Sequence, residues 1–202
     1  IGIVFMLIGM AVSFTLKSKF QRYSQMPISN GMSGKDIAEK MLTDNGVYGV
    51  KVICVEGQLT DHYNPQNRTV NLSNDVYNGR NAAAAAVAAH ECGHAIQHAE
   101  KYRMLEMRSA MVPIQAVSGK ILNMILLLSI FGGYALYKTI PIDTIIYIFI
   151  ACYGVFTMFS FVTLPVEFDA SRRALAWMTN KGIVNRKEHA HAKDALTWAA
   201  LT

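Results

Sequence analysis

Long uncharged stretches dominate the hydrophobic pattern of this chain. Residues 121–137 carry no charged side chain, and neither do residues 145–164. A helix of about 20 residues crosses the hydrocarbon core of a bilayer. The connector at residues 138–144 is short and contains a proline, so the pattern predicts an antiparallel transmembrane hairpin over residues 121–164. The alternative, two buried helices of a soluble core, is disfavoured by the length of both stretches.

The opening residues 1–16 are also uncharged, and the chain does not start with methionine. We expect a truncated transmembrane anchor here, because the positive residues Lys17, Lys19 and Arg22 follow the apolar stretch. A cleaved signal peptide carries its positive charges in front of that stretch instead. The charge order favours an anchor whose C-terminal side is in the cytosol.

Charges around the predicted hairpin give an independent test of this orientation. The connector contains one basic residue, Lys138, and one acidic residue, Asp143. The flanks of the hairpin are basic at both ends, with Arg103, Arg108 and Lys120 before it and Arg172 and Arg173 after it. Because cytosolic flanks are enriched in Lys and Arg, we expect residues 17–120 and 165–202 in the cytosol. The prediction is a multi-pass protein of the cell (plasma) membrane whose hydrophilic parts face the cytoplasm.

The hydrophilic part of the chain contains shorter patterns that predict a helix and two strands. Residues 35–43 place apolar side chains on one helical face, and the Asn-Gly pair after them is a C-cap signal, which predicts a short amphipathic helix. Residues 50–55 and 68–72 are rich in β-branched and apolar side chains. Because turn residues 61–67 separate them, the pattern predicts a small β-hairpin.

An alanine-rich run predicts a long helix that begins with Asn81 as its N-cap. This helix carries the HExxH pattern at residues 90–94. Residues four apart share a helix face, so His90 and His94 can bind one Zn²⁺ through their imidazole nitrogens. Glu91 then lies beside the metal without binding it. There it can accept a proton from water that zinc has activated and pass it to a leaving amine.

The third zinc ligand is expected downstream. A three-histidine site would have glycine and histidine at the positions of Gln97 and Glu100, so that class is excluded. Glu167 directly follows the second apolar stretch, and an antiparallel hairpin returns it to the membrane face at which the HExxH helix ends. A solvated interfacial carboxylate is the alternative for Glu167. The expected ligands of one zinc ion per chain are His90, His94 and Glu167.

Other polar residues are candidates for supporting roles. Asp169 is expected to orient a ligand imidazole by accepting its second N–H, with a simple helix charge as the alternative. His62 or Tyr63 is a candidate for stabilising the oxyanion, although a turn histidine commonly has no catalytic role. His98 is not expected as a fourth ligand, because a catalytic zinc needs an open position. Cys92 points away from the ligand face and is expected to serve in packing.

Composition supports this picture and disfavours a nucleic-acid-binding protein and a cysteine-based scaffold. The chain is 52% hydrophobic and 16% charged, below the about 25% typical of soluble domains. Its net charge is +5, but no Lys/Arg run is longer than Arg172-Arg173, so we expect no nucleic-acid partner. The three cysteines, Cys54, Cys92 and Cys152, are an odd number and form no CxxC pattern, so they suggest neither a disulfide framework nor a cysteine zinc finger. A reducing compartment is the simplest interpretation.

The whole chain resembles the YugP-type neutral zinc metallopeptidases, a family of bacterial membrane proteases. The segments that carry the resemblance are long: FQRYSQ (20–25), GMSGKDIAEKML (31–42), LTDHYNPQNRTVNLSNDVY (59–77), VAAHECGHAIQH (87–98) and PVEFDASRRAL (165–175). The arrangement is similar to that of HtpX and the CAAX prenyl proteases. In those gluzincins, HExxH supplies two histidines and the general base, and a downstream ExxAD supplies the third ligand.

The resemblance assigns these roles to His90, His94, Glu91 and Glu167. Ser171 stands where the HtpX and CAAX prenyl protease relatives have aspartate, so the role of that aspartate has no obvious counterpart in this sequence. The resemblance also implies a further apolar segment after residue 202.

The sequence therefore predicts a mainly α membrane protein. Its expected parts are a truncated anchor (1–16), a cytosolic zincin-like catalytic domain with a small β-hairpin and the HExxH helix (17–120), a transmembrane hairpin (121–164), and a cytosolic helix with the third ligand (165–202). Peptides or proteins are the expected substrates and the lipid bilayer the expected surroundings. The strand at residues 70–73 is a candidate edge for pairing with an extended substrate.

Two alternatives belong to other functional classes. One is a catalytically silent zinc-binding membrane scaffold or chaperone-like protein that keeps the ligands. The other is a channel or transporter component, which is disfavoured because neither apolar stretch carries an internal charge.

Overall fold

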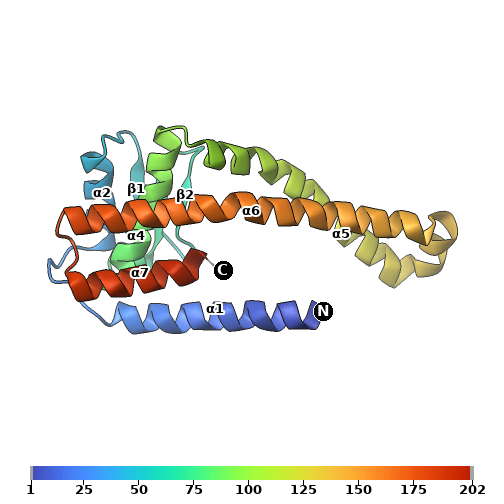
Figure 1. Ribbon diagram of the computed structural model, residues 1–202, viewed down its shortest axis with the longest axis horizontal. Helices are drawn as coiled ribbons and strands as arrows, with labels where there is room; N and C mark the ends of the chain where they lie inside the picture. The colour runs from blue at the N-terminus through green and yellow to red at the C-terminus, as the bar shows by residue number, and fades with distance from the viewer. Residues whose placement is uncertain (1, 201–202) are drawn as a thin grey trace. The chain divides into compact units, whose positions relative to one another are not determined.

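The computed structural model describes residues 2–200, except for the side chains of residues 2–8 and 134–137. Figure 1 shows a mostly helical chain with one small sheet, which confirms the predicted mainly α architecture. The chain divides into two compact units: unit 1 comprises residues 1–102 and 166–202, and unit 2 comprises residues 103–165. The outer ends of the expected anchor and of the last expected segment, residues 1 and 201–202, lie outside the described residues.

Unit 1 contains the sheet and the candidate metal ligands. Its helices are α1 (Gly2–Ser24), α2 (Gly34–Asp44), α3 (Asn74–Tyr77), α4 (Ala82–Ala99), the C-terminal part of α6 (Ile142–Asn180) and α7 (Arg186–Ala200). Its strands are β1 (Lys51–Val55), β2 (His62–Asn64) and β3 (Thr69–Ser73).

The sheet has the strand order β1-β3-β2. The two strands expected from the sequence, β1 and β3, do pair, but they run parallel, with Lys51 opposite Thr69. The predicted hairpin between them is therefore wrong. Parallel strands need a longer connection than a hairpin turn, and this connection contains β2, which pairs with β3 in the antiparallel sense. Because β3 is the central strand, the expectation that residues 70–73 form an open edge is also wrong.

The short helix expected at residues 35–43 is confirmed as α2. A capping box starts it: the Ser33 hydroxyl accepts from the Asp36 N–H, and the Asp36 carboxylate accepts from the Ser33 N–H. Asn45 caps the C-terminal end. The apolar face of α2 is buried against α4, as the amphipathic pattern requires.

Helix α4 forms the centre of unit 1 and contacts both α2 and α7. Asn81 is its N-cap as predicted, because its side-chain oxygen accepts from the Ala84 N–H at 2.9 Å. Residues 82–86 are buried alanines, so neighbouring helices approach this part of α4 closely. Larger side chains from the surrounding elements complete the core: Ile37, Met41, Val70, Leu72, Met178 and Leu196. Burial of each large apolar side chain stabilises the fold by about 1.5–3 kcal/mol.

The predicted long helix is shorter than the alanine-rich pattern suggests. α4 ends at Ala99, and Lys101 adopts a left-handed conformation with φ 55° before α5 begins at Arg103. A non-glycine residue rarely adopts positive φ, so this break has no signal in the sequence. It also marks the boundary between unit 1 and unit 2.

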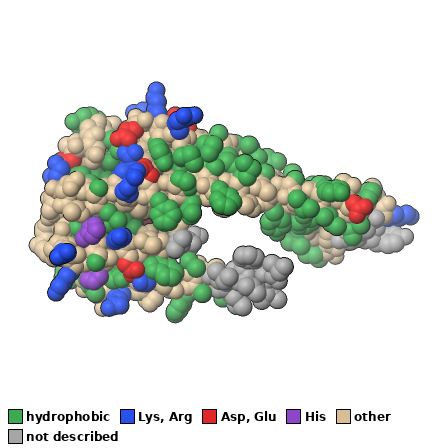
Figure 2. All heavy atoms as spheres, viewed as in Figure 1, with side chains coloured by type: hydrophobic (Ala, Val, Ile, Leu, Met, Phe, Trp, Pro, Cys, Tyr) green, Lys and Arg blue, Asp and Glu red, His purple; other side chains and the backbone are tan. Residues whose placement is uncertain are grey.

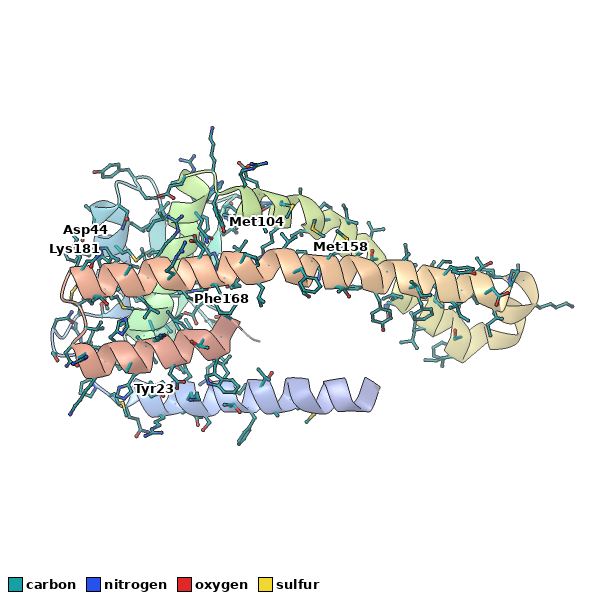
Figure 3. All side chains as sticks on the ribbon, viewed as in Figure 1. Tyr23, Asp44, Met104, Met158, Phe168 and Lys181 are labelled. Atoms are coloured by element: carbon teal, nitrogen blue, oxygen red, sulfur yellow. The ribbon has the colours of Figure 1, made fainter. Side chains whose placement is uncertain are left out.

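Polar contacts attach the outer helices of unit 1. Lys19 and Tyr23 of α1 both bond to one carboxylate oxygen of Asp194 on α7, each at 2.5 Å. Asp44 at the end of α2 lies 3.4 Å from the ammonium group of Lys181, just after α6. Figure 3 labels Tyr23, Asp44 and Lys181 on these elements. Helices far apart in the sequence are thus joined around α4.

Unit 2 consists of α5 (Arg103–Thr139) and residues 142–165 of α6. The helix α5 departs from helical geometry at Gly132. Both helices include stretches long and apolar enough to cross a membrane, 103–133 in α5 and 142–180 in α6. Many large hydrophobic side chains of this unit are exposed, such as Phe131 at 84%, and Figure 2 shows such side chains along it. The two apolar helices expected from the sequence are therefore present.

Candidate metal centre

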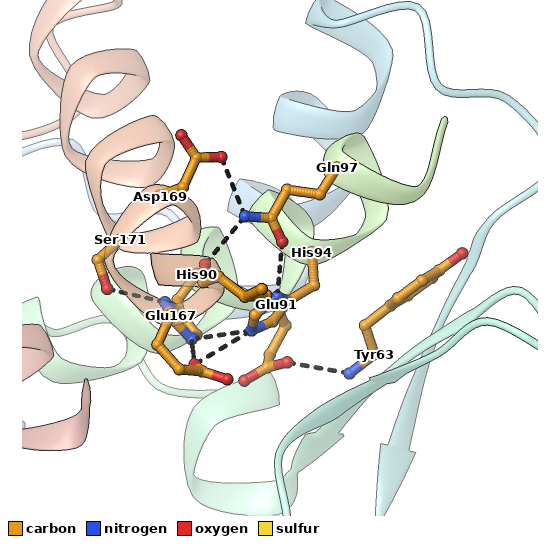
Figure 4. Close-up of polar contacts among 9 residues, drawn as sticks. Tyr63, His90, Glu91, His94, Gln97, Glu167, Asp169 and Ser171 are labelled. Atoms are coloured by element: carbon orange, nitrogen blue, oxygen red, sulfur yellow. Dashed lines mark hydrogen bonds and ion pairs between the residues drawn. The ribbon is translucent and has the colours of Figure 1, made fainter. Parts of the chain in front are cut away.

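Three potential ligand atoms converge where α4 meets the C-terminal part of α6 (Figure 4). Nε2 of His90 lies 3.1 Å from Oε2 of Glu167 and 3.2 Å from Nε2 of His94. Nε2 of His94 lies 3.4 Å from the same carboxylate oxygen. Both histidines are buried and Glu167 is half-buried. The predicted ligand set is thus brought together from positions far apart in the chain.

These separations can be compared with the geometry of a tetrahedral zinc site. With zinc–ligand distances of about 2.0–2.1 Å, neighbouring ligand atoms lie roughly 3.3–3.4 Å apart. The observed separations of 3.1, 3.2 and 3.4 Å are close to that edge length. Two imidazole nitrogens and a carboxylate are donors that suit zinc, and three protein ligands leave one position open. The residues therefore fit a zinc ion.

Gln97 determines the orientation of His94. The Gln97 amide nitrogen donates to the Val166 carbonyl at 2.9 Å, so the Gln97 oxygen must face Nδ1 of His94, 3.0 Å away. Since that oxygen can only accept, Nδ1 of His94 carries the proton. In the neutral imidazole, Nε2 is then left unprotonated and faces the cluster.

Ser171 contacts the other histidine. Its hydroxyl lies 3.1 Å from Nδ1 of His90, the ring nitrogen that points away from the cluster. A hydroxyl can accept the Nδ1–H and so keep Nε2 of His90 available as a ligand. Ser171 thus occupies the place expected of a partner that orients a metal-binding imidazole.

Asp169 differs from its expected role, because it does not contact a ligand imidazole directly. Its carboxylate accepts from the Gln97 amide at 3.0 Å and from Arg173 at 2.6 Å, and it also pairs with Arg172. Asp169 therefore acts on His94 through Gln97. The sequence-based interpretation missed that the side chain of Gln97 is long enough to lie between them.

Glu91 lies next to the ligand cluster on α4 and is 8% exposed. Its Oε2 accepts from the backbone N–H of Tyr63 on β2 at 2.9 Å. The segment before β2 is fastened by Asp61, which accepts from the Ser73 N–H at 2.7 Å. Burial raises the pKa of Asp61, and the nearby charge of Glu91 acts in the same direction, against the hydrogen bonds from Ser73. The sheet thus positions the candidate base through a main-chain contact.

The side chains of His62 and Tyr63 are not brought to the ligand cluster. The Tyr63 hydroxyl bonds to Nδ1 of His98 at 2.9 Å, and Figure 4 shows its ring pointing away from the histidine ligands. His62 is exposed and bonds through Nδ1 to the Thr60 carbonyl at 2.8 Å. The hydrogen bonds described for these two side chains are to Thr60 and His98 and not to the candidate ligands, and their role as oxyanion stabilisers stays a prediction. Only the backbone N–H of Tyr63 reaches the site, through Glu91.

The electrostatics of His94 reflect its acidic neighbours. Burial by itself lowers the pKa of this imidazole, but the hydrogen bond with Glu167 and the charges of Glu91 and Glu167 outweigh it and raise the pKa above its ordinary value. A positive charge at the cluster is therefore favoured. Cys92 is fully buried and bonds to the Ala38 carbonyl, and burial raises the pKa of its thiol, consistent with packing rather than reactivity.

Comparison with known proteins agrees with this geometry. Residues 1–202 match the profile of a family described as "Putative neutral zinc metallopeptidase". The curated "Putative membrane protease YugP" of Bacillus subtilis (strain 168) is 39% identical over 189 residues, which cover 94% of this chain and 80% of that protein. The chain belongs to this zinc metallopeptidase family. No solved structure matches it.

Three contributors to the site of this zinc metallopeptidase family member were missed by sequence reasoning. In the sequence, Gln97 stands out only because it is not glycine, although its position three residues after His94 places it on the same helix face. In the sequence, Ser171 is a departure from an aspartate and gives no sign of its contact with His90. The backbone N–H of Tyr63 had no signal, because main-chain hydrogen bonds depend on strand pairing that the sequence does not specify.

Proposed function

We propose that the protein is a zinc metalloendopeptidase of the gluzincin type, embedded in the cell membrane, with its active site facing the cytoplasm. The observation that carries this proposal is the convergence of His90, His94 and Glu167 within 4.8 Å, with Glu91 beside them. The family membership and the name of the Bacillus subtilis relative, a membrane protease, support a peptidase role.

One zinc ion would be held by the two Nε2 atoms and the Glu167 carboxylate. Two ring nitrogens and a carboxylate oxygen lie 3.1–3.4 Å from one another, and a cation among them would be bound by all three, which favours a metal at this point. When bound, zinc supplies Lewis-acid activation of water and of the peptide carbonyl. Gln97 and Ser171 hold the imidazoles in the orientation that this binding requires.

Glu91 is the general base and then the general acid. The Tyr63 N–H holds one of its carboxylate oxygens, so the second oxygen can take the proton that water loses. Oxygen from water joins the carbonyl carbon, the C–N bond breaks, and Glu91 returns the proton to the leaving nitrogen. The products are one new carboxyl end and one new amino end.

The membrane part of the proposal rests on unit 2. Its helices α5 and α6 include candidate spans, and the basic residues lie outside the apolar stretches at 121–137 and 145–164. By the positive-inside rule, the two ends of this hairpin lie in the cytosol. Unit 1, which carries the ligands, would then act on peptide or protein substrates at the cytoplasmic surface.

Metal content and hydrolysis measured on the same detergent-purified samples test the proposal. Wild type should hold about one zinc per chain and cleave casein. Glu91→Gln should keep its zinc and lose hydrolysis by a factor of about 10² or more, whereas Glu167→Ala should lose both. A Glu39→Gln variant, on the exposed face of α2, is the matched control and should behave as wild type.

Each contrary result has a definite meaning. A wild type that binds zinc but cleaves nothing, in detergent and in liposomes, would favour the scaffold alternative. Retention of zinc by Glu167→Ala would mean that the third ligand is another residue. Absence of metal in wild type would refute the zinc peptidase assignment for this chain.

A further inference from the structure

A cavity of about 260 Å³ opens directly onto the candidate catalytic residues. His90, Glu91 and Glu167 contribute to its wall, and apolar side chains from four elements or loops provide most of the remainder: Leu16, Phe20, Leu59, Val87, Ala195, Leu196 and Ala199. Asp61 also borders it. This volume is near the lower limit for small-molecule sites, so it suits one side chain better than a whole cofactor.

The side chains that line this cavity are of two kinds: acidic or histidine side chains, and apolar side chains. Its described charged residues are all acidic or histidine, and no Lys or Arg is among the described residues that line it. An acidic side chain would meet Asp61, Glu91 and Glu167 without a compensating cation from the protein. A strongly polar side chain would lose hydration against the leucine, valine and phenylalanine side chains. An apolar side chain is the occupant that this lining accommodates.

Leu59 gives a second, independent observation. It adopts the left-handed conformation with φ 56° and is 43% exposed. Such a conformation is unfavourable for a non-glycine residue, and strained residues cluster at functional sites. Leu59 also lines a second cavity of about 430 Å³ together with Phe20, so these two side chains lie where the two cavities adjoin.

The second cavity differs in chemistry from the first. Away from Phe20 and Leu59 its lining is polar, with Lys17, Gln58 and Asp75 among its residues. A chain that extends from the catalytic residues past Leu59 therefore passes from an apolar pocket into a polar one. This succession suits an extended peptide whose side chains occupy separate pockets.

We propose that the cavity beside Glu91 is the specificity pocket for a large apolar residue, leucine or phenylalanine, at the position adjoining the scissile bond. The proposal rests on the proposed peptidase function and assigns its substrate class. Phe20 and Leu59 separate this pocket from the polar cavity, which receives a neighbouring part of the same peptide. Helix α1 therefore contributes to substrate recognition through Leu16 and Phe20 as well as to any membrane anchoring.

A peptide library tests the proposal with the full chain in detergent. The products of a mixed proteome-derived peptide library are sequenced by mass spectrometry, and the residues on both sides of each cleaved bond are counted. One of the two flanking positions should be enriched in Leu and Phe and depleted in Asp and Glu. A set of quenched fluorogenic peptides that differ only at that position then gives kcat/KM, which should be at least about tenfold higher for Leu than for Asp.

Two variants connect that preference to this cavity. Ala199→Phe places a large side chain in the pocket, so kcat/KM for the Leu peptide should fall about tenfold or more while that for an Ala peptide falls less. Leu59→Gly relieves the positive φ and removes the side chain, so KM for the Leu peptide should rise about fivefold without loss of thermal stability. Thr197→Phe, exposed on the same helix as Ala199, is the control and should keep the wild-type preference.

Zinc content and Tm of every variant establish that it is folded and loaded. If wild type cleaves the library with no preference for Leu or Phe, the pocket assignment is wrong while the peptidase function stands. If Ala199→Phe lowers kcat/KM equally for the Leu and Ala peptides, the preference arises elsewhere. If wild type cleaves nothing, the proposed function itself fails.

Discussion

The side-chain amide of Gln97 fixes which ring nitrogen of His94 carries a proton. Its nitrogen is engaged by the Val166 carbonyl and by Asp169, so its oxygen must accept from Nδ1 of His94. In the neutral ring, the ligand atom Nε2 is thereby left without a proton and can bind a metal. This arrangement is a relay from the Asp169 carboxylate through one buried amide to a candidate ligand.

Replacing Gln97 should weaken metal binding without touching a ligand. Gln97→Leu has a similar volume but removes the acceptor of His94 Nδ1 and leaves the Val166 carbonyl without its donor. Loss of such an orienting partner typically costs 10–100-fold in metal affinity, so we expect a zinc Kd about 10–100-fold higher. Competition with a fluorescent chelator measures it, with the exposed Gln66→Leu as control. Unchanged affinity would mean that the His94 orientation is fixed by other contacts.

Substitution of Ser171 is expected either to weaken or to strengthen zinc binding, depending on the residue introduced. Ser171→Ala removes the hydroxyl beside Nδ1 of His90 and should weaken zinc binding about tenfold. Ser171→Asp introduces the aspartate that the resemblance to HtpX and the CAAX prenyl proteases places here, and should bind zinc more tightly because a carboxylate makes the imidazole a stronger ligand. The same chelator competition applies. Equal affinities for the Ala and Asp variants would contradict an orienting role.

The chemistry of the site was predictable to the extent that it depends on local spacing. HExxH brings His90 and His94 to one helix face at any position in a fold, and Glu167 follows from the return of an antiparallel hairpin. The supporting contacts were not predictable in this way. Gln97 and Asp169 meet only because α4 and α6 approach closely, which depends on tertiary packing.

The fold was predictable where one signal dominates. The apolar stretches, the capped helix α2 and the Asn81 cap all follow from side-chain chemistry within a few residues. Strand pairing did not follow, because β2 has only three residues and lies among turn-forming residues. The end of α4 did not follow either, since Lys101 gives no glycine signal for its positive φ.

The approach of α4 and α6 depends on Gly93. A Cβ at Gly93 would lie 2.7 Å from the carbonyl oxygen of Ala170, a backbone atom that cannot move aside alone. Gly93→Ala should therefore destabilise the fold by about 1–3 kcal/mol and reduce zinc content by separating the ligands. Gly154→Ala, where a Cβ has nothing within 4 Å, is the matched control and should be neutral or slightly stabilising. Thermal unfolding and elemental analysis check both. If Gly93→Ala keeps the wild-type Tm and zinc content, the two helices can separate without loss of stability or of metal binding.

Glu188 provides a pH-dependent contribution to stability outside the metal site. It is 7% exposed and accepts from the Ser29 N–H at 2.8 Å, the Ser29 hydroxyl at 2.6 Å and the Asn185 N–H at 2.7 Å. Burial alone raises the pKa of Glu188, but these hydrogen bonds outweigh it and lower the pKa below its ordinary value. A lowered pKa in the folded state means that the stabilisation is present above the unfolded pKa of about 4.3 and is lost as the pH falls through the folded value.

Glu188→Gln should accordingly lower stability at pH 7 by about 1–3 kcal/mol, equivalent to a decrease in Tm of about 2–10 °C. The difference from wild type should shrink below about pH 4, where the wild-type carboxylate becomes protonated. Thermal unfolding across this range measures the effect, and the exposed Glu39→Gln variant should show neither change. A difference that is constant with pH would indicate a loss of packing instead of a loss of charge.

Metal removal should loosen the contact between α4 and α6. Zinc bound only by the folded state stabilises it, so treatment with a chelator should lower Tm, and added zinc should restore it. In Glu167→Ala, chelation should have little effect, because its ligand set is already incomplete. A chelator-insensitive Tm in a wild type shown to contain zinc would mean that the ion does not connect the two helices.

The ligand set is divided by the whole of unit 2, since His90 and His94 precede it and Glu167 follows it. During synthesis, a nascent chain exposed only as far as α4 has two histidines and Glu91 but lacks the third ligand. If the proposed function holds, the zinc site can be completed only after both apolar helices have been made and the chain beyond them has left the ribosome. Under that proposal, the order of residues along the chain would delay peptide cleavage until the apolar helices are available for insertion.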